Sequence, residues 1–279
     1  MGYFNNEDSI IAEQAYTRML KLAESMKPKE DKDLWELQSL YWDRPRFMNL
    51  FRKLMRFHQG QKLRILDLGC GNGKFLYICS TFGFKELIGV DYFQTKETSY
   101  LATVEGGSIS NSVDFNKPNF LNFFQDESID CLVCMETFEH LLNHPLGFLL
   151  EGWKKLRPGG ILLFTVPNPA NLANALKLIS GRSYQWGMCK FAMLPKLSLE
   201  SQGFNPEWDI HFMEYAQPDM QTVFNQVPGA IVLDKGFVGA DPYYLDSLSK
   251  RLFKWLLKLL HLRDWRLFSN TQYWVLRKQ

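Results

Sequence analysis

The sequence has no uninterrupted apolar stretch approaching the ~20 residues that a membrane-spanning helix needs. Its first stretch, MGYFNNEDSI, also lacks the basic segment and apolar core of a secretory leader. Internal repeats and low-complexity tracts are missing as well. These absences argue against a helical integral membrane protein and against a fibrous or repetitive one. We expect a globular, cytoplasmic protein.

The sequence also lacks a large excess of basic or acidic residues. The chain has 32 Lys and Arg residues against 30 Asp and Glu residues, a formal net charge of +2. This small surplus argues against nucleic acid as a partner, because phosphate binding normally needs a concentrated basic surface. A small-molecule partner is the simpler expectation.

Cysteine is sparse, with five residues, an odd number. Cys131 and Cys134 form a CxxC pattern, but both lie in one predicted strand, where residues three apart point to opposite faces. We therefore expect all five cysteines to be reduced thiols.

A glycine-rich turn is the most informative feature that is present. Residues 65–76, ILDLGCGNGKFL, begin as a short apolar run, which predicts a strand buried on both faces of a parallel sheet. Gly69, Gly71 and Gly73 follow it, and glycines allow positive φ and let a ligand lie against backbone amides. The stretch predicts a site for a nucleoside cofactor.

An acidic residue follows the next apolar run. The sequence LIGV at residues 87–90 predicts a second strand, and Asp91 comes directly after it. A carboxylate at the tip of this strand can accept hydrogen bonds from both hydroxyls of a ribose.

Together these motifs resemble those of the class I S-adenosylmethionine-dependent methyltransferases, within the broad type 11 and type 23 families that include the ubiquinone-pathway O-methyltransferases. The glycine spacing is GxGxG, whereas dinucleotide-binding dehydrogenases use GxGxxG. Later segments also match in order: 113–115 (VDF) the end of the third strand, 128–141 the fourth strand and its loop, 156–168 the RPGG turn and fifth strand, 230–238 the sixth strand and 271–278 an antiparallel seventh. The resemblance implies a doubly wound, seven-stranded, mostly parallel α/β sheet with a Rossmann-like fold.

The resemblance further implies S-adenosyl-L-methionine as the cofactor. Asp67 would organise the glycine loop or contact the methionine amino group, and Asp91 would bind the ribose. Asp114 with Phe115 would frame the adenine, whose face Tyr92 or Phe93 would cover. The cofactor-binding residues implied in this way are Asp67, Gly69, Cys70, Gly71, Gly73, Asp91, Tyr92, Asp114, Phe115 and Met135.

Two regions flank this core pattern. Residues 1–60 have helical apolar spacing and predict an N-terminal helical region or lid, ahead of a methyltransferase domain over 61–279. The second half of that region has a basic face, which is either solvated or receives cofactor or substrate. Segment 169–215 breaks the strand and helix alternation before a helix that starts near Gln217. We expect it to be an insertion after the fifth strand that covers the substrate; its members include Asn171, Asn174, Trp186, Met188, Phe191, Met193, Trp208 and His211.

A cluster of acids and histidine follows the predicted fourth strand. Glu136, Glu139 and His140 would lie on one side of a single helical turn. The ExxEH pattern resembles that of the ubiquinone-pathway O-methyltransferases and of the small-RNA 2′-O-methyltransferases, and His211 occupies a place comparable to a later histidine of the RNA family. The resemblance implies either Mg²⁺ or Mn²⁺ held by Glu139, His140, His211 and Glu136, or metal-free acid and base roles for Glu139, His140 and His211; purely structural roles also stay open.

The resemblance implies an enzyme that methylates a hydroxyl oxygen of a small-molecule, sugar or lipid-linked acceptor. The alternatives are a metal-dependent RNA 2′-O-methyltransferase and a protein that binds S-adenosylmethionine without turnover. Residues 249–266 add one more expectation, because they form a basic amphipathic pattern. Such a helix either links the last two strands or also makes a peripheral contact with a membrane. The sequence does not indicate an oligomeric state.

Overall fold

The computed structural model describes residues 6–25, 31–57, 63–84, 86–92, 107–110, 112–141, 145–181, 211–239, 252, 255–256, 259–262 and 264–279. The strands are β1 (Arg64–Leu68), β2 (Glu86–Val90), β3 (Gly107–Ser110), β4 (Ile129–Met135), β5 (Leu156–Pro167), β6 (Ala230–Val238) and β7 (Thr271–Lys278). The helices are α1 (Asn6–Ser25), α2 (Asp31–Phe57), α3 (Lys74–Ser80), the short 3₁₀ helix η2 (Phe138–His140), α4 (Pro145–Lys155), α5 (Leu172–Ile179) and α8 (Gln217–Asn225). None of these described helices is long and apolar enough to cross a bilayer.

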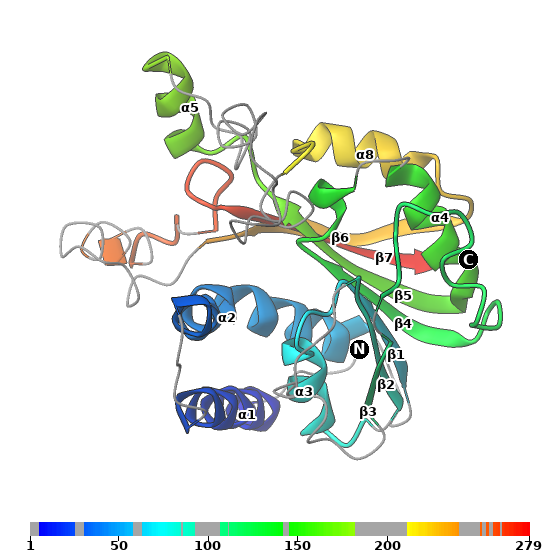
Figure 1. Ribbon diagram of the computed structural model, residues 1–279. Coiled ribbons are helices and arrows are strands. Elements are labelled where there is room, and N and C mark those ends of the chain that lie inside the picture. The colour runs from blue at the N-terminus through cyan, green and yellow to red at the C-terminus, as the bar shows by residue number, and fades with distance from the viewer. Residues whose placement is uncertain are drawn as a thin grey trace.

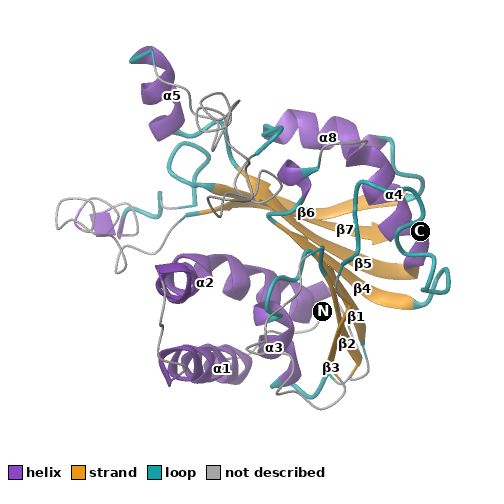
Figure 2. Cartoon of the chain, in the orientation of Figure 1, coloured by secondary structure: helices purple, strands orange, loops and turns teal. Residues whose placement is uncertain are grey.

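The strands form one sheet in the order β3-β2-β1-β4-β5-β7-β6. The pairs from β3 to β5 are parallel, and β7 runs antiparallel to both β5 and β6. Helices α1, α2 and α3 lie on one side of the sheet, and α4 and α8 lie on the other (Figures 1 and 2). This arrangement confirms the expected doubly wound sheet with its inserted antiparallel seventh strand.

Alternating strand residues supply two separate cores. Ile65 and Val133 face the layer of α1, α2 and α3, whereas Leu66 and Leu132 face α4 and α8. Cys131 and Cys134 are divided between these two cores in the same way. The CxxC pair therefore points to opposite faces, as expected, and both thiols are free.

The third strand differs from the sequence expectation. It ends at Ser110, and Val113–Phe115 lie in the loop that follows. The backbone turns away because Ser112 has a φ of 63° and Val113 N–H then donates to the Asp91 carbonyl at 3.1 Å. Asp114 therefore belongs to a loop at the carboxyl end of the sheet.

A glycine turn bends the start of β5. The register with β4 shifts between the pairs Ile129–Leu156 and Cys131–Ile161, so β5 holds extra residues there. Gly159 in the RPGG turn has a φ of +78°, which suits glycine. Strand β5 begins directly after α4. The bulge allows this short connection and still lets the central part of β5 pair with β4.

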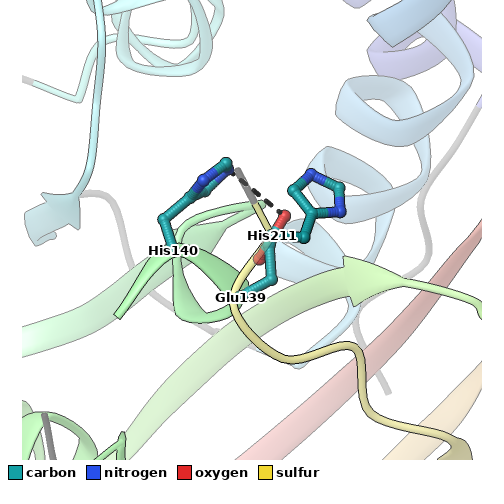
Figure 3. A group of neighbouring side chains, drawn as sticks. All are labelled: Glu139, His140 and His211. Atoms are coloured by element: carbon teal, nitrogen blue, oxygen red, sulfur yellow. Dashed lines mark ion pairs between the residues drawn. The ribbon is translucent and has the colours of Figure 1, made fainter. Parts of the chain in front are cut away.

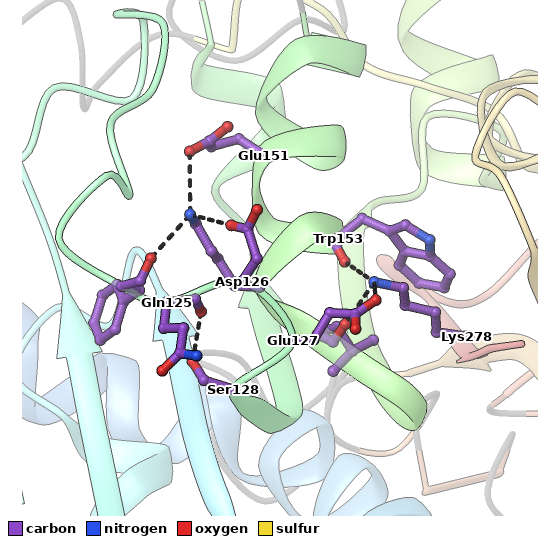
Figure 4. A network of polar contacts seen from close by, with 10 residues as sticks. Gln125, Asp126, Glu127, Ser128, Glu151, Trp153 and Lys278 are labelled. Carbon is purple, nitrogen blue, oxygen red and sulfur yellow. Dashed lines mark hydrogen bonds and ion pairs between the residues drawn. The ribbon is translucent and has the colours of Figure 1, made fainter.

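Two lysines join this end of the sheet to α4 and the preceding turn. Lys155, which is buried, lies 2.6 Å from the Asp126 carboxylate and donates to the Phe124 carbonyl. Lys278 of β7 donates to the carbonyls of Trp153 and Leu156 (Figure 4). These contacts compensate the desolvation of both ammonium groups, so we assign them a structural role.

The N-terminal helices pack on the sheet as part of the same unit. One face of α1 is buried at Ala12, Ala15, Tyr16 and Met19, whereas Ile10 and Ile11 of the expected apolar face are exposed. Helix α2 lies between α1 and the sheet, and Lys53 pairs with Asp234 of β6 at 2.7 Å. The end of α2 therefore has a fixed position over the sheet.

Candidate functional site

The glycine turn closes the carboxyl end of β1 tightly. Gly69 N–H donates to the Val90 carbonyl at 2.8 Å, and Gly69 has a φ of +76°. A Cβ on this residue would lie 2.1 Å from Thr137 Oγ1, so only glycine fits between the two loops. Gly71 also has a positive φ of +52°, but a Cβ there would meet open space. The space beside Gly71 is therefore open, whereas the Thr137 side chain fills the space beside Gly69.

Asp91 lies beside the turn, as expected from the sequence. Its carboxylate accepts a hydrogen bond from the Gly71 N–H at 2.8 Å. The same residue is anchored through its backbone N–H to the Ser110 carbonyl at 3.0 Å. These two contacts fix the Asp91 carboxylate at the tip of β2, beside the glycine turn.

A pocket opens between the carboxyl ends of β1, β2 and β4, where the strand order reverses direction. In doubly wound sheets this switch point is the usual ligand site. The pocket holds about 670 Å³ of empty space, which includes its open mouth. Its lining consists of Gly69, Gly71, Asp91, Tyr92, Asp114, Phe115, Asn116, Glu136, Thr137, His140 and Leu141.

Four of the residues implied for the cofactor do not line the pocket. Cys70 points into the core, where its Sγ lies against Gly89, and Met135 packs against the same core. Gly73 is the N-cap of α3. Asp67 is buried under the turn. The cofactor roles of these four stay predictions, and Phe93 lies outside the described residues.

Asp67 is an ionisable group with an unusual environment. Both of its carboxylate oxygens are buried without a hydrogen-bond partner among the described residues. Burial, and then the negative charge of Asp91, raise the pKa of Asp67 to about 8, although Arg46 opposes this shift. A positive group placed above the turn would relieve the cost of its ionised form.

The loop after β4 forms the opposite wall of the pocket. Glu136 has a φ of +49°, a left-handed conformation that costs a non-glycine residue about 1–2 kcal/mol. Its carboxylate lies 3.4 Å from Arg46 Nη1, while Arg46 Nη2 pairs with Asp43 at 2.9 Å. Strained residues of this kind cluster at functional sites.

Arg46 is the functional candidate that the sequence did not single out. It comes from α2, where it was one member of a basic face, and its side chain is mostly buried. Burial lowers the pKa of its guanidinium, but Asp43, Glu136 and Glu139 outweigh burial and raise it. The guanidinium therefore stays charged and places a fixed cation at the edge of the site.

Three of the four candidate catalytic or metal-binding residues come together. The possible ligand atoms of Glu139, His140 and His211 all lie within 4.8 Å of one another (Figure 3). His140 Nε2 is 3.9 Å from Glu139 Oε1, and the two imidazole rings meet edge to face at 4.9 Å between centroids. Glu136 is not a member of this group, since residues 138–140 form only a 3₁₀ turn and Glu136 precedes it.

Backbone and side-chain contacts hold His211 in this group. Phe212 N–H donates to the Glu139 carbonyl at 2.8 Å, which ties the end of the 169–215 insertion to η2. His211 Nδ1 lies 2.9 Å from the Glu214 carboxylate. If Nδ1 donates this hydrogen bond, Nε2 presents its lone pair, as in the carboxylate–histidine pairs that support metal ligands.

Glu139 has the most perturbed carboxyl of the site. The residue is buried, and neither carboxylate oxygen accepts a hydrogen bond from the described part of the chain. Burial, followed by the charge of Glu136, raises the pKa of Glu139 well above its ordinary value. Burial also raises the pKa of Glu136, although Arg46 opposes that shift. A protonated Glu139, or one paired with a bound cation, would satisfy this environment.

Most of the expected substrate cover lies outside the described residues, including Trp186, Met188, Phe191, Met193 and Trp208. Of its other members, Asn171 caps α5, because its side chain accepts a hydrogen bond from Asn174 N–H at 2.9 Å. His211 is the member whose position at the site is defined.

Comparison with known protein families gives a match over the region just described. The family described as "Methyltransferase domain" matches residues 42–203. This range includes the glycine turn, Asp91, the loop after β4 and the end of α2 that holds Arg46.

Individual relatives match a shorter part of the chain. The "Ubiquinone biosynthesis O-methyltransferase" of Rickettsia bellii is 29% identical over 118 residues, which are 42% of this chain and 48% of the relative. The protein with the same description from Mesorhizobium japonicum is 32% identical over 119 residues, 42% of this chain and 46% of that protein. The chain thus spans about half the length of these relatives.

Among solved structures, a SAM dependent methyltransferase from Archaeoglobus fulgidus has a similar fold. Its TM-score is 0.56 at 17% identity, and the match covers 90% of this chain and 100% of that one. At this identity the likeness shows the fold alone.

Proposed function

Because the chain belongs to the methyltransferase domain family, we propose that it transfers the methyl group of S-adenosyl-L-methionine to a hydroxyl oxygen of a small-molecule, sugar or lipid-linked acceptor. The observation that carries this proposal is the group of Glu139, His140 and His211 beside the pocket that Asp91 borders. It supplies imidazoles where a hydroxyl proton must be removed. Similarity to the O-methyltransferases of ubiquinone biosynthesis supports oxygen as the acceptor atom.

The cofactor fits the charge pattern of the pocket. Asp91 would accept hydrogen bonds from the ribose hydroxyls, and Gly71 leaves room for the sugar against the backbone. Tyr92 and Phe115 line the part of the pocket next to Asp91 and Asp114, where they can contact the adenine. The cationic methionine portion would then lie toward the acidic side formed by Glu136 and the buried Asp67.

The chemical step needs an aligned and partly deprotonated acceptor oxygen. This oxygen attacks the methyl carbon in line with the C–S bond, which breaks and leaves its electron pair on sulfur. The acceptor proton passes to His140 or His211, and the products are a methyl ether and S-adenosylhomocysteine. An ionised Glu139, 3.9 Å from His140 Nε2, would stabilise the imidazolium that forms.

A divalent metal ion would fit the same residues. One carboxylate and two imidazoles are a suitable donor set for Mn²⁺ or a similar ion, and less so for Mg²⁺, which prefers oxygen ligands. The possible ligand atoms of these three residues lie within 4.8 Å of one another, so they could converge on one ion. When bound, the ion would lower the pKa of an acceptor hydroxyl, and the unpaired oxygens of Glu139 would gain a partner.

Label transfer tests the proposed function. The purified chain is incubated with methyl-labelled S-adenosylmethionine and an extract of its source cells, and label is followed into small molecules, lipids and RNA. We expect label in the small-molecule or lipid fraction, at a position that resists the conditions that cleave esters. Label in RNA would replace this proposal with the 2′-O-methylation alternative, and no transfer to any fraction would favour a binding protein without turnover.

Substitutions separate the proposed catalytic role of the loop after β4 from the proposed cofactor-binding role of Asp91. We expect Glu139→Gln and His140→Ala to bind S-adenosylmethionine within a few-fold of the wild type but to lose transfer by at least about a hundredfold. Asp91→Ala should instead lose cofactor affinity, while Glu86→Ala, at the opposite end of the same strand, should change neither property. Full transfer by both Glu139→Gln and His140→Ala would remove these residues from the mechanism.

A chelator tests whether methyl transfer depends on a divalent metal ion. If the ion takes part, a chelator abolishes transfer, and added Mn²⁺ or Mg²⁺ restores it. Full activity in chelator would leave the metal-free acid and base roles.

A further inference from the structure

Helix α5 projects from the carboxyl end of β5 with its apolar side chains uncovered. None of its residues is buried, and Ile179 is 83% exposed. An eight-residue helix with this composition gains little from its own hydrogen bonds, because short isolated helices are marginal in water. Its exposed apolar residues are Leu172, Leu176, Leu178 and Ile179.

A second exposed apolar segment lies before β7. Leu252, Trp255, Leu256, Leu259 and Leu260 follow the i, i+3, i+4 spacing of one helix face. All five are exposed, between 44% and 65%. This is the opposite of the burial expected for a helix that only links two strands and packs on the sheet.

Hydrogen bonds join the start of α5 to residues 266–269, which lie between the second apolar segment and β7. Leu172 N–H, at the start of α5, donates to the Leu267 carbonyl at 2.8 Å. Asn168 Nδ2, which is buried, donates to the carbonyls of Arg266 and Ser269. Both segments extend beyond the same end of the sheet (Figure 1). We call the exposed apolar residues of α5 and of positions 252–267 the apolar surface.

The excess of basic residues in this region favours an anionic partner. Residues 249–266 contain six basic residues and one acid, Asp264, although the chain as a whole is nearly neutral. Lys177 of α5 adds one more exposed cation, and Arg266, one of the six, is also exposed. An isologous contact with a second copy would bring two such basic regions together, which is unfavourable. Anionic lipid head groups would compensate the same charges.

We propose that the apolar surface docks the protein on an anionic phospholipid membrane. Its Leu, Ile and Trp side chains enter the interface, and the basic residues contact the head groups. The carboxyl end of β5 lies at the same edge of the sheet as those of β1 and β4, because the three strands are parallel. In the docked protein, the carboxyl ends of these strands, where the pocket opens, therefore lie near the membrane. The inference does not depend on which acceptor is methylated.

Vesicle flotation tests this proposal on the full chain. Wild-type protein is mixed with vesicles of phosphatidylcholine alone or of phosphatidylcholine with phosphatidylglycerol. We expect binding to the anionic vesicles that weakens as salt is raised. The double variants Leu176→Glu/Ile179→Glu and Leu256→Glu/Leu259→Glu should each reduce binding by about tenfold or more, given the transfer free energy of such side chains.

Phe123→Glu is the matched control, because Phe123 is 52% exposed but lies in the loop after β3. It should float like the wild type. The proposal is overturned if the wild type does not bind anionic vesicles, if it binds neutral ones equally well, or if the double variants bind unchanged. A wild-type dimer that the variants convert to monomers, without vesicle binding, would assign the surface to self-association. Cofactor affinity of the variants is measured in parallel, so a failure here is distinct from a failure of the proposed methyl transfer.

Discussion

At the scale of single residues, contact with the loop after β4 explains why residue 69 must be glycine. Its positive φ and the 2.1 Å that would separate an added Cβ from Thr137 Oγ1 leave no room for a side chain. The sequence pattern predicted a close approach at this glycine, but it assigned the approach to the ligand. The neighbouring strand's loop is what occupies the space.

We expect Gly69→Ala to destabilise the protein by more than Gly71→Ala. Both changes carry the cost of a left-handed residue, about 1–2 kcal/mol, but only the first also forces Thr137 to move. Thermal unfolding of the two variants measures the difference. The combination Gly69→Ala/Thr137→Gly should recover part of the loss, and equal melting temperatures for the two single variants would contradict the steric explanation.

Asp67 should make stability depend on pH. Its pKa is about 8 in the folded protein because burial disfavours its charge, against about 3.9 for an unfolded chain. The folded state therefore keeps a proton that the unfolded chain has lost between about pH 4 and pH 8, and stability decreases as pH rises through this window. Asp67→Asn should match the wild type at pH 4 and exceed its melting temperature at pH 8.

Asp126→Asn provides a control of opposite sign. The hydrogen bond from Lys155, and then its charge, lower the pKa of Asp126. An acid with a lowered pKa stabilises the fold above its unfolded pKa, so this variant should be less stable at pH 8. Wild-type and Asp67→Asn curves that run parallel from pH 4 to pH 8 would show that Asp67 ionises normally.

At the scale of elements, Arg46 couples α2 to the loop after β4. Its guanidinium lies between Asp43 of its own helix and Glu136 of that loop. We expect Arg46→Met to reduce the free energy of unfolding by about 3 kcal/mol, the lower end for a broken buried ion pair, because both partners keep some exposure. Urea unfolding measures the loss.

Arg44→Met is the control on the same helix. Arg44 pairs with Glu13 at 2.6 Å, but both side chains are about one third exposed, so the loss should stay within about 1 kcal/mol. Arg46→Met/Glu136→Gln should recover stability relative to Arg46→Met alone. If the two changes are additive, the Arg46 and Glu136 side chains are not coupled.

The elements also show what sequence reasoning can and cannot reach. Buried strands such as β1 and β4 were predictable because their apolar runs and turn glycines are local signals. The end of β3 was not, since the turn at Ser112 depends on a hydrogen bond to Asp91 made only in the folded chain. Arg46 was missed for the same reason: its partner Glu136 is far away in the sequence, and a basic helix face without that partner is indistinguishable from a solvated one.

At the scale of the whole molecule, the cofactor should stabilise the fold. The pocket lies between loops from β1, β2 and β4, so a bound ligand adds contacts between these three segments. At a concentration one hundred times its Kd, S-adenosylmethionine should add about 2.7 kcal/mol, which raises Tm by roughly 5–10 °C for a domain near this size. Differential scanning calorimetry measures the shift.

Asp91→Ala should show little of this increase at the same cofactor concentration, and adenosine should give a smaller one than the intact cofactor. An unchanged Tm in the wild type, with binding shown independently, would mean that the unfolded chain binds the cofactor equally well.

The position of β7 has a consequence for synthesis of the chain. This strand lies between β5 and β6, and its central residues Trp274, Val275 and Leu276 are fully buried. While the ribosome is still making the stretch after Pro167, the hydrogen-bonding groups along that side of β5 have no strand to pair with, and such an edge invites aggregation. Completion of the sheet must therefore wait until Lys278 has left the exit tunnel, and until then this side of β5 is exposed to wrong pairing.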